Sequence, residues 1–320
     1  MDKEILFSII IPVKNGDQWL DNLFNKLFQQ TLITKTEIIV IDSGSTDNSL
    51  TIINNYPVKL IQIPAATFNH GETRNLGVKA AKGKYVVLTV QDAVPASDLW
   101  LQYLLDGFVS EDIAAVCGQQ IVPHDNDKNP VLWFRFFSEP QITFRYFKNP
   151  ADFLKLSPQD QRNIAGWDNV NAAYNREILL LNPFAKIDFA EDMNWAKEML
   201  LQKYTLAFVD KARVFHYHHH KAEFILPRYF SVFYFEYKIF KLKPSQSNIL
   251  KSGLSNFKTL VNMQAISLKE KYNWLLFNIR YRIELNKTIL LFNNTLEKGE
   301  DFLDNQYKII CKKMPQAPKY

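Results

Sequence analysis

Continuous apolar runs alternate with amphipathic stretches along the first two-thirds of the chain. Residues 7–13, 37–42 and 85–90 form predicted strands whose central positions are apolar on both alternating sides, which is typical of strands buried on both faces of a parallel sheet. Between the first two runs, residues 19–30 carry apolar side chains at helical spacing. This order predicts right-handed β–α–β units and an α/β fold, Rossmann-like, with a mostly parallel sheet flanked by helices.

The pattern changes after residue 222. Residues 227–243 mix aromatic and basic side chains at helical spacing, and Ser267 with Glu270 forms a capping box that predicts a long helix ending near Gly299. We therefore predict an α/β domain, residues 1–222, followed by a basic, aromatic-rich helical region, residues 223–320. The pattern leaves three roles open for this region: packing on the first domain, forming a homodimer, or docking on a membrane.

Charge is distributed unevenly along the chain. Residues 221–320 hold 17 Lys and Arg against 8 Asp and Glu, whereas residues 1–220 hold 21 against 25. The basic end predicts an anionic partner surface, and since no nucleic-acid recognition motif is present, we expect that partner not to be nucleic acid. Two distant cysteines, no signal-peptide pattern and no apolar run of about 20 residues predict a cytoplasmic protein, with peripheral contact to the inner face of the cell membrane left open.

Two of the predicted strands end in an aspartate, Asp42 and Asp92. Ligands of parallel α/β sheets bind beyond the carboxyl ends of the strands, and a carboxylate there is suited to hold a divalent cation against a diphosphate. Arg74, in a predicted loop between these strands, has a guanidinium group that is suited to bind phosphate. The alternative is that all three are ordinary turn residues. Neither a dinucleotide-binding glycine motif nor a P-loop is present.

Two further stretches carry candidate chemistry. Glu191 and Asp192 open a predicted helix, where acidic residues are common for structural reasons and where the helix terminus is expected to keep a carboxylate ionised. His216 and His218 alternate in an extended segment and so share one face, where they are suited to a metal or a diphosphate. A zinc site and simple exposure to solvent remain open, and His219 and His220 have no assigned role.

Several segments resemble family-2 glycosyltransferases of the GT-A fold. They are residues 7–13, 40–47 and 91–93, while residues 68–77 together with Gln91-Asp92-Ala93 resemble the branch that includes bacterial rhamnosyltransferases. The resemblance covers about residues 5–222. This chain has Ser43 where many members have a second acid, and Gln91-Asp92-Ala93 where most have Asp-x-Asp, so the metal site offers one carboxylate.

The resemblance implies an inverting sugar transferase with a nucleotide-diphospho-sugar donor, dTDP-L-rhamnose being favoured. The acceptor would be a hydroxyl of a bacterial surface polysaccharide or of its lipid-linked precursor. Asp192 would be the general base beside Glu191, and Mg²⁺ or Mn²⁺ would be held by Asp92, His216 and His218. Donor binding falls to the following residues: Pro12, Asp42, Ser43, Arg74, Asn75, Gln91, Asn169 and Asn171.

The aromatic-rich residues 121–165 either shape the acceptor side or form a satellite core. Two other functions stay open. One is transfer of another hexose from a UDP-sugar. The other is a non-catalytic scaffold in polysaccharide assembly, which the single carboxylate at Asp92 favours.

Overall fold

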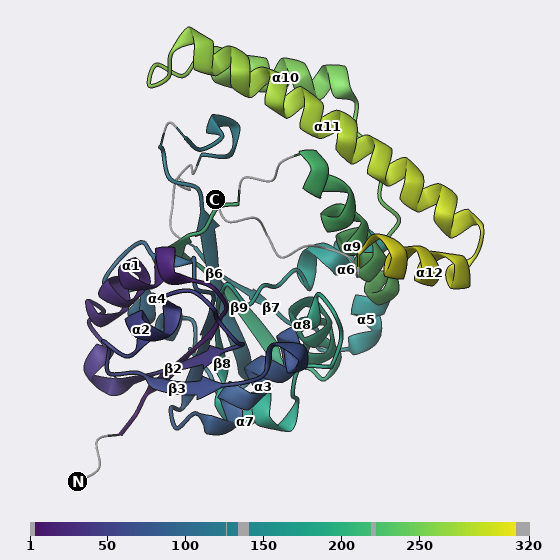
Figure 1. Ribbon diagram of the computed structural model, residues 1–320. Coiled ribbons are helices and arrows are strands. Elements are labelled where there is room, and N and C mark those ends of the chain that lie inside the picture. The colour runs from purple at the N-terminus through teal and green to yellow at the C-terminus, as the bar shows by residue number, and fades with distance from the viewer. Residues whose placement is uncertain (1–3, 126, 134–140, 219–221, 312–320) are drawn as a thin grey trace. The chain divides into compact units, whose positions relative to one another are not determined.

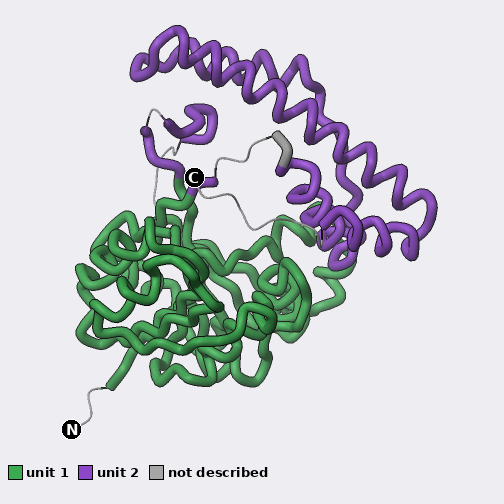
Figure 2. The backbone as a smooth tube through the Cα atoms, in the orientation of Figure 1, with its two compact units in different colours: residues 1–121, 136–216 green, residues 122–135, 217–320 purple. Residues whose placement is uncertain are grey.

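The protein is described by a computed structural model that covers residues 4–125, 127–133, 141–218 and 222–311 (Figure 1). The chain divides into two compact units, residues 1–121 with 136–216, and residues 122–135 with 217–320 (Figure 2). The domain boundary at residue 222 and the roles assigned to the two domains stay predictions. Phe134, Phe136 and Phe137 of the aromatic-rich segment, and His219 and His220, lie outside the described residues.

A nine-stranded sheet forms the centre of the first unit, in the order β3-β2-β1-β4-β8-β6-β9-β5, with β7 paired to β9. The strands β3, β2, β1 and β4 are parallel to one another, and so are β6 and β9. Strand β8 lies antiparallel between β4 and β6. The predicted α/β fold with a mostly parallel sheet is confirmed. The strand bounds are β1 Phe7–Val13, β2 Thr36–Asp42, β3 Lys59–Gln62, β4 Tyr85–Thr89, β5 Val94–Pro95, β6 Ile113–Ile121, β7 Ile142–Arg145, β8 Asn171–Asn175 and β9 Thr205–Phe215.

Helices cover both faces of this sheet, which is why its strands are apolar on both faces. Apolar residues of α1 (Asp17–Phe28), α2 (Ser49–Ile53) and α4 (Trp100–Asp106) form one core with Ile9 and Val87. On the other face, a Cβ at Gly77 of α3 (His70–Ala80) would meet the Ile10 side chain at 2.6 Å, so glycine lets this helix approach the sheet closely. The remaining helical elements of the unit are η1 Ile33–Lys35, η2 Ala65–Thr67, α5 Pro150–Leu154, α6 Pro158–Ile164, α7 Arg176–Leu181 and α8 Glu191–Leu201.

Arg74 lies on a helix and not in a loop, which corrects the expectation from the sequence. Helix α3 begins at His70 because Asn69 caps it, accepting hydrogen bonds from the backbone N–H groups of Gly71 and Glu72 at 3.1 Å each. An Asn followed three residues later by Glu is the signal that predicts this start. The side chain of Arg74 is therefore held by a rigid element.

The second unit is helical. Its elements are η3 Pro130–Leu132, α9 Ala222–Phe240, α10 Ile249–Val261, α11 Leu268–Glu297 and α12 Glu300–Ile310. The predicted capping box is confirmed: the Ser267 side chain accepts from the Glu270 N–H, and the Glu270 carboxylate accepts from the Ser267 N–H at 2.7 Å. Phe230 and Phe233 of α9 pack against Phe292 of α11. Over the described part of the chain, every helix is too short or too polar to cross a bilayer.

Candidate active site

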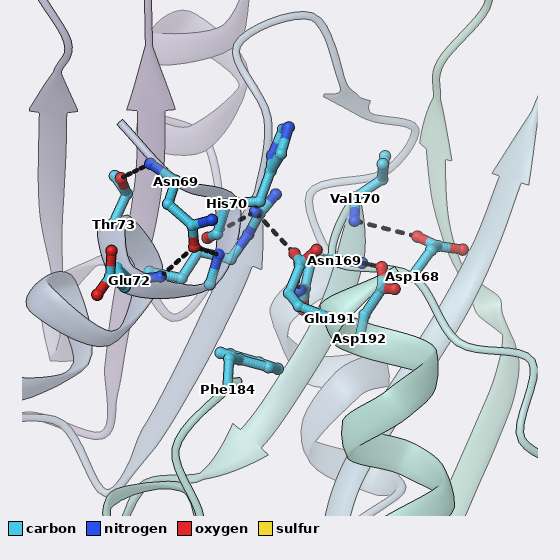
Figure 3. Close-up of polar contacts among 12 residues, drawn as sticks. Asn69, His70, Glu72, Thr73, Asp168, Asn169, Val170, Phe184, Glu191 and Asp192 are labelled. Carbon is cyan, nitrogen blue, oxygen red and sulfur yellow. Dashed lines mark hydrogen bonds and ion pairs between the residues drawn. The ribbon is translucent and has the colours of Figure 1, made fainter. Parts of the chain in front are cut away.

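The first turn of α8 presents two neighbouring carboxylates to the interior of the first unit (Figure 3). Ala190, directly before it, adopts the left-handed conformation with φ 63° and ψ 30°. This conformation costs a residue with a Cβ about 1–2 kcal/mol. The residue at the N-cap position of α8 is this Ala190, so its side chain caps none of the first N–H groups. The left-handed conformation of Ala190 and its lack of a capping side chain both lower the stability of this helix end. Local strain of this kind clusters at functional sites.

Glu191 is held in a buried ion pair with Arg74. Arg74 Nη1 lies 3.0 Å from Glu191 Oε1 and also donates to the carbonyl oxygen of His70 at 3.1 Å. The amide Nδ2 of Asn169 donates to the same Glu191 oxygen at 3.0 Å, and the Tyr174 hydroxyl donates to Asn169 Oδ1 at 2.5 Å. Oε1 of Glu191 is thus bound by both a cation and an amide, which hold this carboxylate in place. Its catalytic role stays a prediction.

Asp192 is half-buried, and both of its carboxylate oxygens accept hydrogen bonds from backbone N–H groups. Its Oδ2 accepts from the backbone N–H of Asn169 at 3.1 Å, and its Oδ1 accepts from that of Met193 at 2.8 Å (Figure 3). Burial, followed by the negative charges of Glu191 and Asp168, raises the pKa of Asp192 to about 8. The raised pKa runs against the expectation that the helix terminus favours the ionised form, because loss of water and two acidic neighbours outweigh the backbone donor.

Asp168 is a site residue that the sequence analysis missed. Burial also raises the pKa of its carboxyl group, although that group accepts hydrogen bonds from the Gln120 side chain and from the Val170 N–H, the latter at 3.0 Å. Asp168 and Asp192 thus place two carboxyl groups with raised pKa values beside each other. The only signal in the sequence is an acid directly before Asn169.

Gln120 connects this acidic pair to the histidine segment. Its Oε1 lies 2.6 Å from Nδ1 of His216. Because an amide oxygen only accepts, Nδ1 of His216 carries the proton and Nε2 offers its lone pair. That Nε2 lies 3.6 Å from Oδ1 of Asp92, which follows β4 in a turn. A fixed tautomer of this kind is what metal-ligating histidines usually have.

Asp92, His216 and His218 each offer one ligand atom, and these atoms all lie within 4.8 Å of one another. One oxygen and two imidazole nitrogens, all from half-buried residues, form a donor set of the kind that binds divalent transition metals. The residues therefore fit such an ion.

The other predicted donor-binding residues use their side chains to shape loops at the same sheet edge. Asp42, nearly fully buried, accepts from the backbone N–H groups of Gly44 and Ser45. Gln91 binds both backbone groups of Lys14, at 2.9 and 3.2 Å. Ser43 Oγ donates to the carbonyl oxygen of Val13, and Pro12 lies within β1.

Asn75 and Asn171 are likewise engaged inside the protein. Asn75 bonds both backbone groups of Phe184, in the segment that leads to α8. Asn171 is fully buried, donates to the carbonyl oxygen of Ala212 at 2.7 Å and accepts from the Trp100 indole at 2.8 Å. The role of all these residues in donor binding stays a prediction.

Comparison with known families settles the class of the protein. The family model described as glycosyl transferase family 2 matches residues 8–180, more than half of the chain. The chain belongs to glycosyl transferase family 2. The resemblance inferred from the sequence motifs is therefore confirmed, and the protein is a glycosyltransferase.

Relatives of this family-2 glycosyltransferase include two enzymes of O-antigen assembly. WbaN of Salmonella anatum, described as an O-antigen chain rhamnosyltransferase, is 32% identical over 231 residues, which is 70% of each chain. RfbN of Salmonella typhimurium strain LT2, described in the same words, has the same identity and coverage. The resemblance to the rhamnosyltransferase branch is thus confirmed at the level of homology.

Solved structures with the same fold include other glycosyltransferases. Residues 1–349 of S. aureus TarS in complex with UDP-GlcNAc superpose with a TM-score of 0.53 at 16% identity, covering 88% of this chain and 74% of that one. Glucosyl-3-phosphoglycerate synthase from Mycobacterium tuberculosis in complex with UDP gives a TM-score of 0.51 at 15% identity, covering 75% and 82%. At such identities the likeness concerns the fold, and it confirms the GT-A architecture.

Proposed function

We propose that this glycosyltransferase moves L-rhamnose from dTDP-L-rhamnose, with inversion, to a hydroxyl of a bacterial surface polysaccharide or of its lipid-linked precursor. The observation that carries the proposal is the 32% identity to two O-antigen chain rhamnosyltransferases over 70% of both chains. The family model matches residues 8–180, within the part of the chain where the sugar donor and the acceptor hydroxyl meet in this fold class. The reaction would take place on the cytoplasmic side, where nucleotide-sugars are made, with a lipid-linked acceptor at the inner face of the membrane.

Asp192 is the proposed general base. Its Oδ2 is positioned by the backbone of Asn169, and Glu191 is neutralised by Arg74, which leaves Asp192 as the carboxylate able to accept a proton. As the acceptor oxygen attacks the anomeric carbon, its proton passes to Asp192, and the bond to the diphosphate breaks on the opposite face of the sugar. A pKa near 8 makes Asp192 a stronger base than an ordinary carboxylate.

Asp92, His216 and His218 are the proposed metal ligands. When bound there, Mn²⁺ or Mg²⁺ supplies positive charge to the leaving diphosphate. Two imidazole nitrogens favour Mn²⁺, since Mg²⁺ prefers an all-oxygen shell. Donor recognition is assigned to two groups of residues. Asp42 and Ser43 would contact the nucleobase and ribose. The sugar and diphosphate would be held by Arg74, Asn75, Gln91, Asn169 and Asn171.

The first test is ligand-dependent thermal stability. Ligands that bind only the folded protein raise its melting temperature by mass action. We expect dTDP to stabilise the protein more than UDP does, and the shift to require Mn²⁺. The shift should be lost in Asp92→Ala and kept in Asp106→Ala, which removes an exposed carboxylate at the end of α4. A shift with UDP alone would refute the rhamnose assignment and leave the transferase intact.

The second test is turnover. Asp192→Asn should lower kcat roughly 10²- to 10⁴-fold while dTDP still stabilises the variant, because the base acts after donor binding. If the folded wild-type protein turned over no nucleotide-sugar and bound no nucleotide, the scaffold alternative would replace the enzymatic one.

A further inference from the structure

Helix α10 has two apolar faces, and the described residues cover only one of them. Leu260 is buried, and Gly253 lies against Ile279 of α11, so one face packs within the helical unit. The second face carries four residues at positions i, i+4, i+7 and i+11, and they are 52–79% exposed. We call them the α10 stripe: Leu250, Leu254, Phe257 and Val261. An apolar stripe of this spacing is what a helix presents to a partner or to a membrane.

Further exposed apolar residues follow soon after the end of α10 in sequence. Leu268 and Tyr272, in the first turns of α11, are 83% and 62% exposed. Single exposed apolar residues are ordinary in proteins. Six of them within 23 residues, on two consecutive helices that pack together, are a local concentration of exposed apolar side chains. Figure 1 shows α10 and the start of α11 side by side, and the two helices pack against each other.

Positive charge accompanies the stripe. Helix α10 contains Lys251 and Lys258 and no acidic residue, and Lys269 and Lys271 follow at the start of α11. The acid nearest to them in sequence, Glu270, is engaged in the capping box through the Ser267 N–H. In the described part of the chain, none of these four lysines forms an ion pair with an acid, so the surface around the stripe carries positive charge.

We propose that the α10 stripe, with Leu268, Tyr272 and the flanking lysines, is a docking surface for an anionic lipid bilayer. The apolar side chains would enter the boundary between headgroups and acyl chains, and the lysines would meet lipid phosphates. A second copy of the chain that docked through the same surface is a poorer occupant, because it would bring the same lysines against these lysines.

The length of the element fits this geometry. Thirteen residues of α-helix extend about 20 Å, less than the roughly 30 Å of a bilayer core. Helix α10 would therefore lie in the plane of the membrane surface. The surface belongs to the helical unit alone, so the inference stands apart from the proposed donor and reaction.

The experiment is flotation of the full-length protein with lipid vesicles, without donor or acceptor. We expect it to float with vesicles of phosphatidylcholine mixed with phosphatidylglycerol, and not with phosphatidylcholine alone. Salt should weaken the binding by screening. The double variant Leu254→Ser/Phe257→Ser should bind roughly tenfold more weakly or worse, and Lys251→Gln/Lys258→Gln should lose the preference for anionic lipid.

The matched control is Leu181→Ser, which removes an equally exposed leucine, 78% exposed, from α7 of the other unit. It should float like the wild-type protein. Circular dichroism checks that each variant is folded. Absence of wild-type binding to anionic vesicles, or equal binding by the stripe variant, would overturn the proposal. So would a wild-type dimer in light scattering that the stripe variant converts to monomer, since the stripe would then join two copies of the chain.

Discussion

The buried pair of Arg74 and Glu191 makes the most decisive prediction. In Arg74→Met, the Glu191 carboxylate keeps the Asn169 amide but loses its cation at 3.0 Å, at a place where both side chains are only 6% exposed. Removing one partner of a buried ion pair costs about 3–5 kcal/mol, because the remaining charge stays in a poorly hydrated site. For a unit of this size, that corresponds to a fall in Tm on the order of 10 °C.

Thermal and urea unfolding, followed by circular dichroism, measure this effect. The control is Lys186→Met, which breaks the exposed pair between Lys186 and Glu72, 2.8 Å apart, and should change stability by less than about 1 kcal/mol. The double variant Arg74→Met/Glu191→Leu should recover much of the loss, since it buries neither charge.

A Tm of Arg74→Met close to that of the wild-type protein would refute this reasoning. If the same variant also lost its stabilisation by dTDP, Arg74 would act on the nucleotide, as the sequence analysis predicted, and not on the turn of α8. Loss of stability with dTDP binding retained would assign it to positioning Glu191 and Asp192. The two readouts therefore separate the two roles of one side chain.

Three further predictions follow from the same site. A base acts when deprotonated, so the pH profile of kcat/KM should have a limb that rises towards pH about 8. Asp168→Asn should move this rising limb roughly one pH unit lower, because it removes a negative charge near Asp192. An unmoved limb would contradict the coupling of the two carboxyl groups. His216→Gln should abolish the dependence of dTDP binding on Mn²⁺ in calorimetry, whereas retention of that dependence would remove His216 from the ligand set. Asn69→Ala should cost about 1 kcal/mol in urea unfolding, since α3 loses its cap; no loss would mean that the cap is dispensable.

Local patterns in the sequence predicted much of the fold. The continuous apolar runs predicted strands buried on both faces, and β1 and β4 have that burial. The capping box at Ser267 and Glu270 placed the start of α11 to the residue. Asp42 ends β2, and Glu191 and Asp192 open α8, as the pattern placed them. The prediction that a strand ends in Asp92 is wrong, because β4 ends at Thr89 and Asp92 lies in the turn that follows. The correctly predicted features depend on residues within one or two turns of each other, which is why the sequence alone determined them.

Contacts between distant segments were decided only by the tertiary structure. Arg74 and Glu191 are 117 positions apart and meet because α3 and α8 pack near one another. The raised pKa of Asp192 depends on Asp168, which lies just before β8, and β8 is inserted antiparallel between β4 and β6. Periodicity reports which face of an element is apolar, but not which other element covers it. Desolvation and charge coupling depend on which element covers that face, so they can be predicted only once the order of the strands in the sheet is known.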